Sequence, residues 1–436
     1  MQPLIFKLAN GLRVILIDTK AFPTMTTILL FGAGSRYENE KNNGIAHFLE
    51  HMVFKGSKKY PDFFTVSSVL EGLGASHNAF TSKDHTGFWV KSPTEHFEKV
   101  IDVVADIILR PLLPALEIER EKGVIVQEMN MYEDTPMRRV GEYFEQLLYQ
   151  RNPLGMDVVG KKETVTKFQR QTFVDYMRQF YHPKNAVLVV AGGLQNMEHV
   201  TRNMKHYSNI IEEKFAKFEV GHPAGGQARI LKVLENQKKQ EMKIHYKKTE
   251  QTHFTLGFRA FSFKDRRKYA LAVLGTMLGG GASSRLFIEV RERRGLCYYI
   301  HTGREHYHDV GYMATQAGVT NNLETIKKAI DTILEEHKKI MKGRIKIEEL
   351  KRAKEIIKGR VLLSMEDSAN VASWYGTKQI LEGTIENVDE VLKKIKSVTG
   401  DEVTELAREI FRPERLNLAL IGPFKEDTMK QIITDL

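Results

Sequence analysis

The chain has 436 residues, of which 42% are hydrophobic, and one cysteine, Cys297. This length and composition predict roughly two to four domains with sizeable cores and exclude a disulfide framework or a cysteine-rich zinc site. The net charge of +10 is dispersed, because lysines in helical stretches such as residues 335–358 alternate with glutamates, as on a solvated helix face. We therefore expect no nucleic-acid partner.

The sequence shows no signal peptide, no transit peptide and no apolar run long enough to span a membrane. A single cysteine favours a reducing compartment. The expected location is therefore the cytoplasm, and we expect no membrane partner.

The first predicted elements are a hairpin at residues 6–18, which turns at Asn10-Gly11, and a strand at 24–31. Residues 42–57 then predict a helix, because start signals at its beginning and stop signals at its end enclose an apolar segment. This segment is apolar nearly all round, which indicates that the helix is buried.

That helix carries His47, Glu50 and His51. The two histidines are four residues apart, so they share one face and both imidazoles can reach a single metal ion. Glu50 lies beside such an ion without having to bind it, in a position to take a proton from an activated water. The alternative is a core in which the three polar side chains satisfy one another. This spacing around a glutamate favours zinc.

A second helix is predicted at residues 63–73, followed by a polar turn and a strand at 86–90. Asn78, Ala79 and Phe80 belong to that turn when the local pattern alone is considered. A further helix at 94–109 precedes two prolines.

A third metal ligand must come from elsewhere, and the helical pattern at residues 115–132 is the best candidate. Glu121 and Glu128 are seven residues apart in it and share one face, where Val124 and Ile125 indicate apolar surroundings. Carboxylates that face inward need a cation, whereas a glutamate on a helix is usually a solvated surface residue.

The second half of the chain repeats the first. After a helix at 170–181, Pro183 and the buried strand 186–191 recur around Pro413 at a constant offset of 230 residues. The pattern predicts an N-terminal domain at 1–215, a linker at 216–228 and a C-terminal domain at 229–436. The fold class is α+β, with two homologous halves that each have a mixed or antiparallel sheet and helices packed on it.

The corresponding part of the second half is a strand at 252–261 and a helix at 267–278, which has no ligating side chains where metal would have to bind. We therefore expect one zinc ion per chain. Residues 279–285 are glycine-rich, but they follow a helix and lack the lysine-serine/threonine ending of a phosphate loop. A flexible connection between helices is the better interpretation.

With these motifs the chain resembles the insulinase/pitrilysin-type zinc metallopeptidases, or inverzincins, and especially their short processing-peptidase-like branch. The segment His47-Phe48-Leu49-Glu50-His51-Met52-Val53-Phe54-Lys55-Gly56 matches the inverted HxxEH motif with its flanks. Glu128 matches the distal zinc ligand of this family, and Glu121 matches an acidic residue that supports the site. The resemblance implies zinc on His47, His51 and Glu128, with Glu50 as the general base.

The resemblance also implies roles that the local pattern does not indicate. Asn78, Ala79 and Phe80 match an edge strand that pairs with the substrate backbone. Arg291 and Tyr298 match an arginine and a tyrosine from the half without zinc, which would stabilise the oxyanion of the tetrahedral intermediate.

The implied function is zinc-dependent endopeptidase activity on short or unfolded peptides, held as an extended strand inside a chamber. Because the chain is about half as long as the large single-chain members, a homodimer is expected, or a heterodimer with a zinc-less homologue. Two alternatives stay open: a non-catalytic structural or assembly subunit of a peptidase-like complex, and a zinc hydrolase that acts on other substrates.

Overall fold

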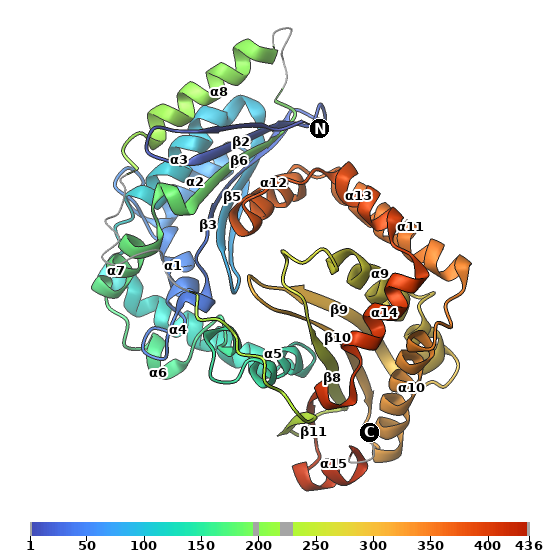
Figure 1. Cartoon of the computed structure of the whole chain (residues 1–436). Coiled ribbons are helices and arrows are strands. Elements are labelled where there is room, and N and C mark those ends of the chain that lie inside the picture. The colour runs from blue at the N-terminus through green and yellow to red at the C-terminus, as the bar shows by residue number, and fades with distance from the viewer. Residues whose placement is uncertain (1, 195–199, 219–229, 434–436) are drawn as a thin grey trace. The chain divides into compact units, whose positions relative to one another are not determined.

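The computed structural model describes residues 2–194, 200–218 and 230–433 (Figure 1). The chain forms two compact units. The first consists of Met1–Met129, Met156–Leu231 and Leu362–Asn387, and the second of Asn130–Gly155, Lys232–Val361 and Val388–Leu436. Of the predicted linker at 216–228, the part from residue 219 onward lies outside the described residues.

The strands and longer helices of the first unit are β1 (Leu4–Lys7), β2 (Arg13–Asp18), β3 (Thr24–Phe31), α1 (Ile45–Val53), α2 (Phe63–Gly72), β4 (Ser76–Thr81), β5 (Thr86–Pro93), α3 (Phe97–Leu109), most of α4 (Ala115–Glu133), α6 (Lys162–Val165), α7 (Arg170–Phe180), β6 (Ala186–Gly192), α8 (Val200–Phe215) and α12 (Ser368–Thr377). Short 3₁₀ or π segments of this unit are η1 (Ser35–Tyr37), η2 (Thr94–His96), η4 (Pro183–Asn185) and η6 (Lys378–Glu382), whereas η3 (Pro153–Gly155) belongs to the second unit.

The sheet of the first unit has the order β1-β2-β6-β3-β5-β4. Strands β2 and β6 pair in parallel, and the other neighbours are antiparallel, so the sheet is mixed. β6 is buried along its whole length, which explains why its sequence is apolar at successive positions rather than at alternate ones.

Helices cover both faces of this sheet (Figure 1). On one face, Val371, Ala372 and Tyr375 of α12 form a core with isoleucine, leucine and valine side chains of β2, β3 and β6. On the other face, α3 packs on β3 and β5, and α1 packs on β4 and β5. The metal-motif helix is therefore fixed against the end of the sheet at which β4 lies.

The elements of the second unit are α5 (Pro136–Leu148), β7 (Glu241–Tyr246), β8 (Gln251–Ala260), α9 (Lys268–Gly279), η5 (Phe287–Glu292), β9 (Cys297–His306), β10 (Gly311–Thr320), α10 (Leu323–Met341), most of α11 (Ile347–Ser364), α13 (Val388–Ser397), α14 (Gly400–Ile410), η7 (Pro413–Arg415), β11 (Leu416–Gly422) and α15 (Glu426–Ile433).

The sheet of the second unit has the order β7-β11-β8-β10-β9, with β7 and β11 parallel and the other pairs antiparallel. Val140, Tyr143 and Phe144 of α5 pack with alanine and isoleucine side chains of the sheet. α9 contacts β9 and β10, while α14 contacts β8. The predicted fold class is confirmed: both halves have a mixed sheet with helices packed on it.

Most predicted elements are present with small shifts at their ends. The hairpin turns at Asn10-Gly11, the strand at 24–31 is β3, and the helix at 115–132 is α4. The helical stretch 335–358 is two helices, since the chain turns between α10 and α11 at Gly343, which has a φ of +71°. Among the described residues, none of the helices is both long and apolar enough to cross a bilayer.

Candidate metal centre

The helix α1 begins after Gly44, which has a φ of +98° that favours glycine. Its first turn is held by the buried carboxylate of Glu38, which accepts hydrogen bonds from the backbone N–H groups of Gly44 and Ala46, both at 2.8 Å, and from Asn43 Nδ2. Burial raises the pKa of Glu38 to about 8, against the effect of these hydrogen bonds. The helix start is therefore capped by a residue that the local sequence does not single out.

The imidazoles of His47 and His51 lie side by side, with ring centroids 4.7 Å apart. His51 Nδ1 lies 2.9 Å from Glu121 Oε1, and the other oxygen of Glu121 lies 2.6 Å from Lys55 Nζ. Burial would raise the pKa of Glu121, but the hydrogen bonds from His51 and Lys55 outweigh it and lower the pKa. A donated proton on Nδ1 leaves the lone pair of His51 on Nε2.

Glu128 of α4 lies opposite the two imidazoles. Its Oε2 atom is 3.5 Å from His47 Nε2 and 3.7 Å from His51 Nε2. In the part of the chain that the structure describes, these three residues are the group that could hold a metal ion, with ligand atoms within 4.8 Å of one another.

Two imidazole nitrogens and one carboxylate oxygen are a donor set that fits zinc. In a tetrahedral site with metal–ligand bonds of about 2.0–2.1 Å, ligand atoms are roughly 3.4 Å apart. The separations from Glu128 to His47 and His51 are close to that value. The residues therefore fit a three-ligand site with one position left for water or substrate.

Glu50 opens onto a cavity of about 280 Å³ beside this cluster, which is also lined by Phe54, Phe63, His77, Asn78 and Ala79. The carboxylate of Glu50 accepts a hydrogen bond of 2.6 Å from the Thr81 hydroxyl. Thr81 is the last residue of β4, and sequence analysis did not identify it. Its place directly after Phe80 is the signal that could have suggested it.

Asn78, Ala79 and Phe80 lie on β4, a strand rather than a polar turn. β4 is the edge strand of the sheet and pairs with β5 alone among the described strands, so no described strand pairs with its other edge. The expected edge strand is therefore present next to Glu50.

Arg291 and Tyr298 belong to the second unit, where the structure brings them together. The Arg291 guanidinium carbon is 5.8 Å from the centroid of the Tyr298 ring, which is 73% exposed. Arg291 also lies over the ring of Phe287 and 3.8 Å from Glu292. Arg291, near the end of η5, is partly exposed, and Tyr298, at the beginning of β9, is exposed.

Family models match most of the chain. Residues 13–162 match the insulinase family (peptidase family M16), and residues 167–357 match the peptidase M16 inactive domain. The uncharacterized zinc protease YmxG of Bacillus subtilis is 32% identical over 415 residues, which cover 95% of this chain and 97% of that protein. An uncharacterized zinc protease of Streptomyces coelicolor, SCO5738, is 30% identical over 96% of this chain and 89% of its own.

Solved structures with a similar fold include a protease from Helicobacter pylori, with a TM-score of 0.88 and 21% identity over 97% of this chain and 99% of that chain. A putative M16-like peptidase from Alicyclobacillus acidocaldarius has a TM-score of 0.81 and 22% identity, over 97% and 98% of the two chains. At these identities the likeness shows the fold.

Proposed function

The chain belongs to the insulinase (M16) family of peptidases, and from this premise we propose that it is a zinc-dependent endopeptidase acting on short or unfolded peptides. One observation carries the proposal. Candidate ligand atoms from α1 and α4 lie within 4.8 Å of one another, and an additional carboxylate, Glu50, lies beside them, which supports a catalytic zinc site.

His47, His51 and Glu128 would hold the metal. A zinc ion bound there supplies a Lewis acid and makes water acidic enough to react near neutral pH. Glu121 orients His51 through the hydrogen bond to Nδ1, and Lys55 holds the other oxygen of Glu121 in turn. This arrangement keeps the ring of His51 in one orientation and one tautomer.

Glu50 serves as the general base and then as the acid. Its carboxylate takes the proton of the attacking water and delivers it to the departing amine. The Thr81 hydroxyl donates to one carboxylate oxygen, so the other oxygen is the one available for the proton. Thr81 therefore positions Glu50 and links it directly to the edge strand.

The substrate would lie extended along β4 and add a strand to the sheet at Asn78, Ala79 and Phe80. Backbone hydrogen bonds give this mode affinity with little dependence on sequence. Because Thr81 ends the same strand, a peptide paired with β4 is brought into register with Glu50.

Arg291 and Tyr298 would supply positive charge and a phenol hydroxyl to the oxyanion that forms during attack. The chain acts as a homodimer or with a zinc-less homologue, and two chains would enclose the substrate in a chamber. A single cysteine, Cys297, agrees with activity in the reducing cytoplasm.

The test is cleavage of a mixed library of unfolded peptides by the zinc-loaded wild type, the Glu50→Gln variant and a chelator-treated sample. We expect the wild type alone to cut, while Glu50→Gln retains zinc. If zinc-loaded wild type cuts nothing, the chain is a non-catalytic subunit or needs a partner chain. If it turns over esters but not peptides, the substrate class is wrong.

A further inference from the structure

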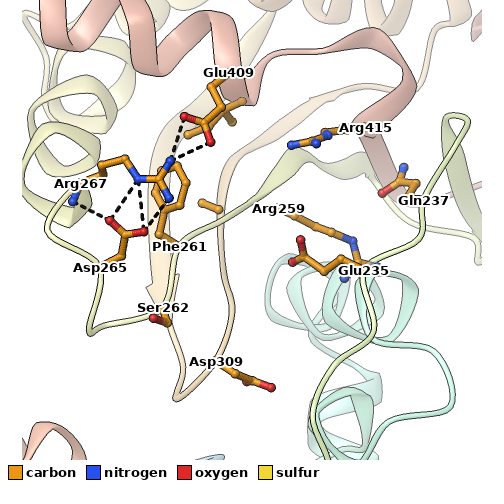
Figure 2. A pocket seen from close by; sticks show the side chains of 12 residues that line it. Glu235, Gln237, Arg259, Phe261, Ser262, Asp265, Arg267, Asp309, Glu409 and Arg415 are labelled. Atoms are coloured by element: carbon orange, nitrogen blue, oxygen red, sulfur yellow. Dashed lines mark hydrogen bonds and ion pairs between the residues drawn. The ribbon is translucent and has the colours of Figure 1, made fainter.

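The second unit contains a separate pocket of about 370 Å³ that plays no part in the proposed reaction (Figure 2). It lies where the end of β8, the β9–β10 turn, the end of α14 and η7 meet the segment that leads into β7. Its volume is in the range of small-ligand sites. The charged side chains that line it are Glu235, Arg259, Asp265, Arg267, Asp309, Glu409 and Arg415.

One of the three arginines, Arg267, is held by hydrogen bonds to carboxylates of the protein. Arg267 Nη1 donates to both oxygens of Glu409, at 2.8 and 2.9 Å, and Nη2 donates to Asp265 at 2.6 Å. Its guanidinium also lies over the ring of Phe261, 3.7 Å from the centroid. These four side chains form one wall of the pocket, in which each of the three guanidinium nitrogens of Arg267 already donates to a carboxylate of the protein.

The other two arginines have donors to spare. Arg259 donates from Nη2 to the carbonyl of Leu148, but its Nε and Nη1 atoms are buried and have no hydrogen-bond partner among the described residues. The guanidinium of Arg415 makes no hydrogen bond within the same part of the chain. Buried donors without acceptors are costly, which points to an acceptor that the protein itself does not supply.

Two carboxylates complete the pocket. Glu235 lies beside both arginines, where desolvation raises its pKa and the charges of Arg259 and Arg415 oppose that rise. Asp309 accepts a hydrogen bond from the backbone N–H of Val233. In Figure 2, Glu235 and Arg259 are neighbours on the side of the pocket away from Asp265.

Arg267, Asp265 and Glu409 pair with one another. The other charged groups that line the pocket are two guanidinium groups and two carboxylates, whose charges cancel. This balance does not suit a multiply charged anion such as phosphate, which the carboxylates would repel. A guanidinium is well matched to a carboxylate, which can accept two parallel hydrogen bonds. An ammonium group on the same ligand would find an acceptor in Glu235.

We propose that this pocket binds a small zwitterion, a free α-amino acid or a short peptide with both termini free, whose carboxylate contacts Arg259 and Arg415 and whose ammonium group contacts Glu235. Such molecules are the end products of proteolysis. The binding itself does not depend on the proposed peptidase activity, because every residue involved lies in the second unit.

The experiment is calorimetric titration of the full-length Glu50→Gln chain, in which turnover is removed, with alanyl-alanine. N-acetyl-alanyl-alanine, alanyl-alanine amide and inorganic phosphate are the comparison probes. We expect alanyl-alanine to bind at least tenfold more tightly than each of them. Arg415→Gln should weaken binding at least tenfold, and Glu235→Gln should weaken alanyl-alanine but not the acetylated probe.

Arg412→Gln is the matched control, since Arg412 is exposed in the same turn and does not line the pocket. Because Arg259→Gln would also remove the hydrogen bond to the Leu148 carbonyl, Arg415→Gln is the decisive variant.

Absence of binding, equal binding of all probes, or unchanged binding by Arg415→Gln overturns the proposal. Phosphate as the tightest ligand would identify an anion site instead. None of these outcomes bears on peptide cleavage by the first unit.

Discussion

The two units share one sheet design and differ in the helix that flanks it. In both, a parallel pair is followed by three antiparallel pairs, β2-β6-β3-β5-β4 in the first unit and β7-β11-β8-β10-β9 in the second. The helix α1 carries His47, Glu50 and His51, whereas α9 contains no histidine and no carboxylate. A helix at this place therefore needs only an apolar face to pack on the sheet, and the candidate metal ligands of α1 are not required for that packing.

The second ligand-bearing helix differs in the same way. At the offset of 230 residues, Glu121 and Glu128 of α4 correspond to Lys351 and Lys358 of α11. Lysines are cations, so the second unit lacks candidate metal ligands on both helices rather than on one. A metal centre in this fold depends on α1 and α4 together.

The two units also exchange a helix. α5 belongs to the second unit although it follows α4, and α12 belongs to the first although it follows α11. The two exchanged helices occupy equivalent places in the repeat and pack on the corresponding sheets. The division predicted from the repeat, residues 1–215 and 229–436, places α5 in the first half and α12 in the second, and so does not include this exchange.

The largest effect is expected from removing a candidate metal ligand of the first unit. His51→Ala or Glu128→Ala should remove zinc and lower peptidase activity roughly a thousandfold or more, since the metal contributes several kcal/mol to the transition state. Zinc content is measured by atomic absorption alongside peptide cleavage. Lys358→Ala, at the corresponding place in the second unit, should leave both unchanged. Zinc retained by either ligand variant would contradict the assignment.

The next effect concerns the exchanged helix α5. Phe144 is fully buried between α5 and the sheet of the second unit, so Phe144→Ala should lower the free energy of unfolding by about 3–5 kcal/mol. Urea denaturation followed by circular dichroism measures it. Met137→Ala on the exposed side of the same helix should cost less than about 0.5 kcal/mol. Equal effects of the two substitutions would mean that α5 is no part of this core.

Sequence reasoning succeeded where the signal is local. Periodicity and turn residues predict α1, β3 and α4, and the spacing of His47 and His51 places both rings on one face. Spacing alone does not select Glu128, which came from a family resemblance. The bond from Thr81 to Glu50 and the exchange of α12 join residues far apart in the chain, and no local pattern encodes them. Glu38 lies only eight residues before Ala46, but it is too far from the first turn to be an N-cap residue, so the capping pattern does not single it out.

A smaller effect is expected at Glu121, whose counterpart in the second unit is Lys351. Glu121→Gln keeps the shape of the side chain but weakens the hydrogen bond to His51 and the ion pair with Lys55. We expect zinc affinity to fall about 10- to 100-fold, as measured by competition with a chelating dye. Glu119→Gln, an exposed position on the same helix, should bind zinc like the wild type. A Glu121 variant with wild-type affinity would make this residue dispensable.

The smallest effect tests whether the edge strand acts on Glu50. Thr81→Val removes the 2.6 Å hydrogen bond to the Glu50 carboxylate while conserving volume, and a hydrogen bond to a charged group contributes about 1.5–3 kcal/mol. We expect kcat to fall roughly tenfold, with KM and zinc content nearly unchanged, because the substrate still pairs with the backbone of β4. Thr81→Ser restores the hydroxyl and should restore kcat. A rise in KM with constant kcat would instead show that Thr81 serves peptide binding and leaves the base unaffected.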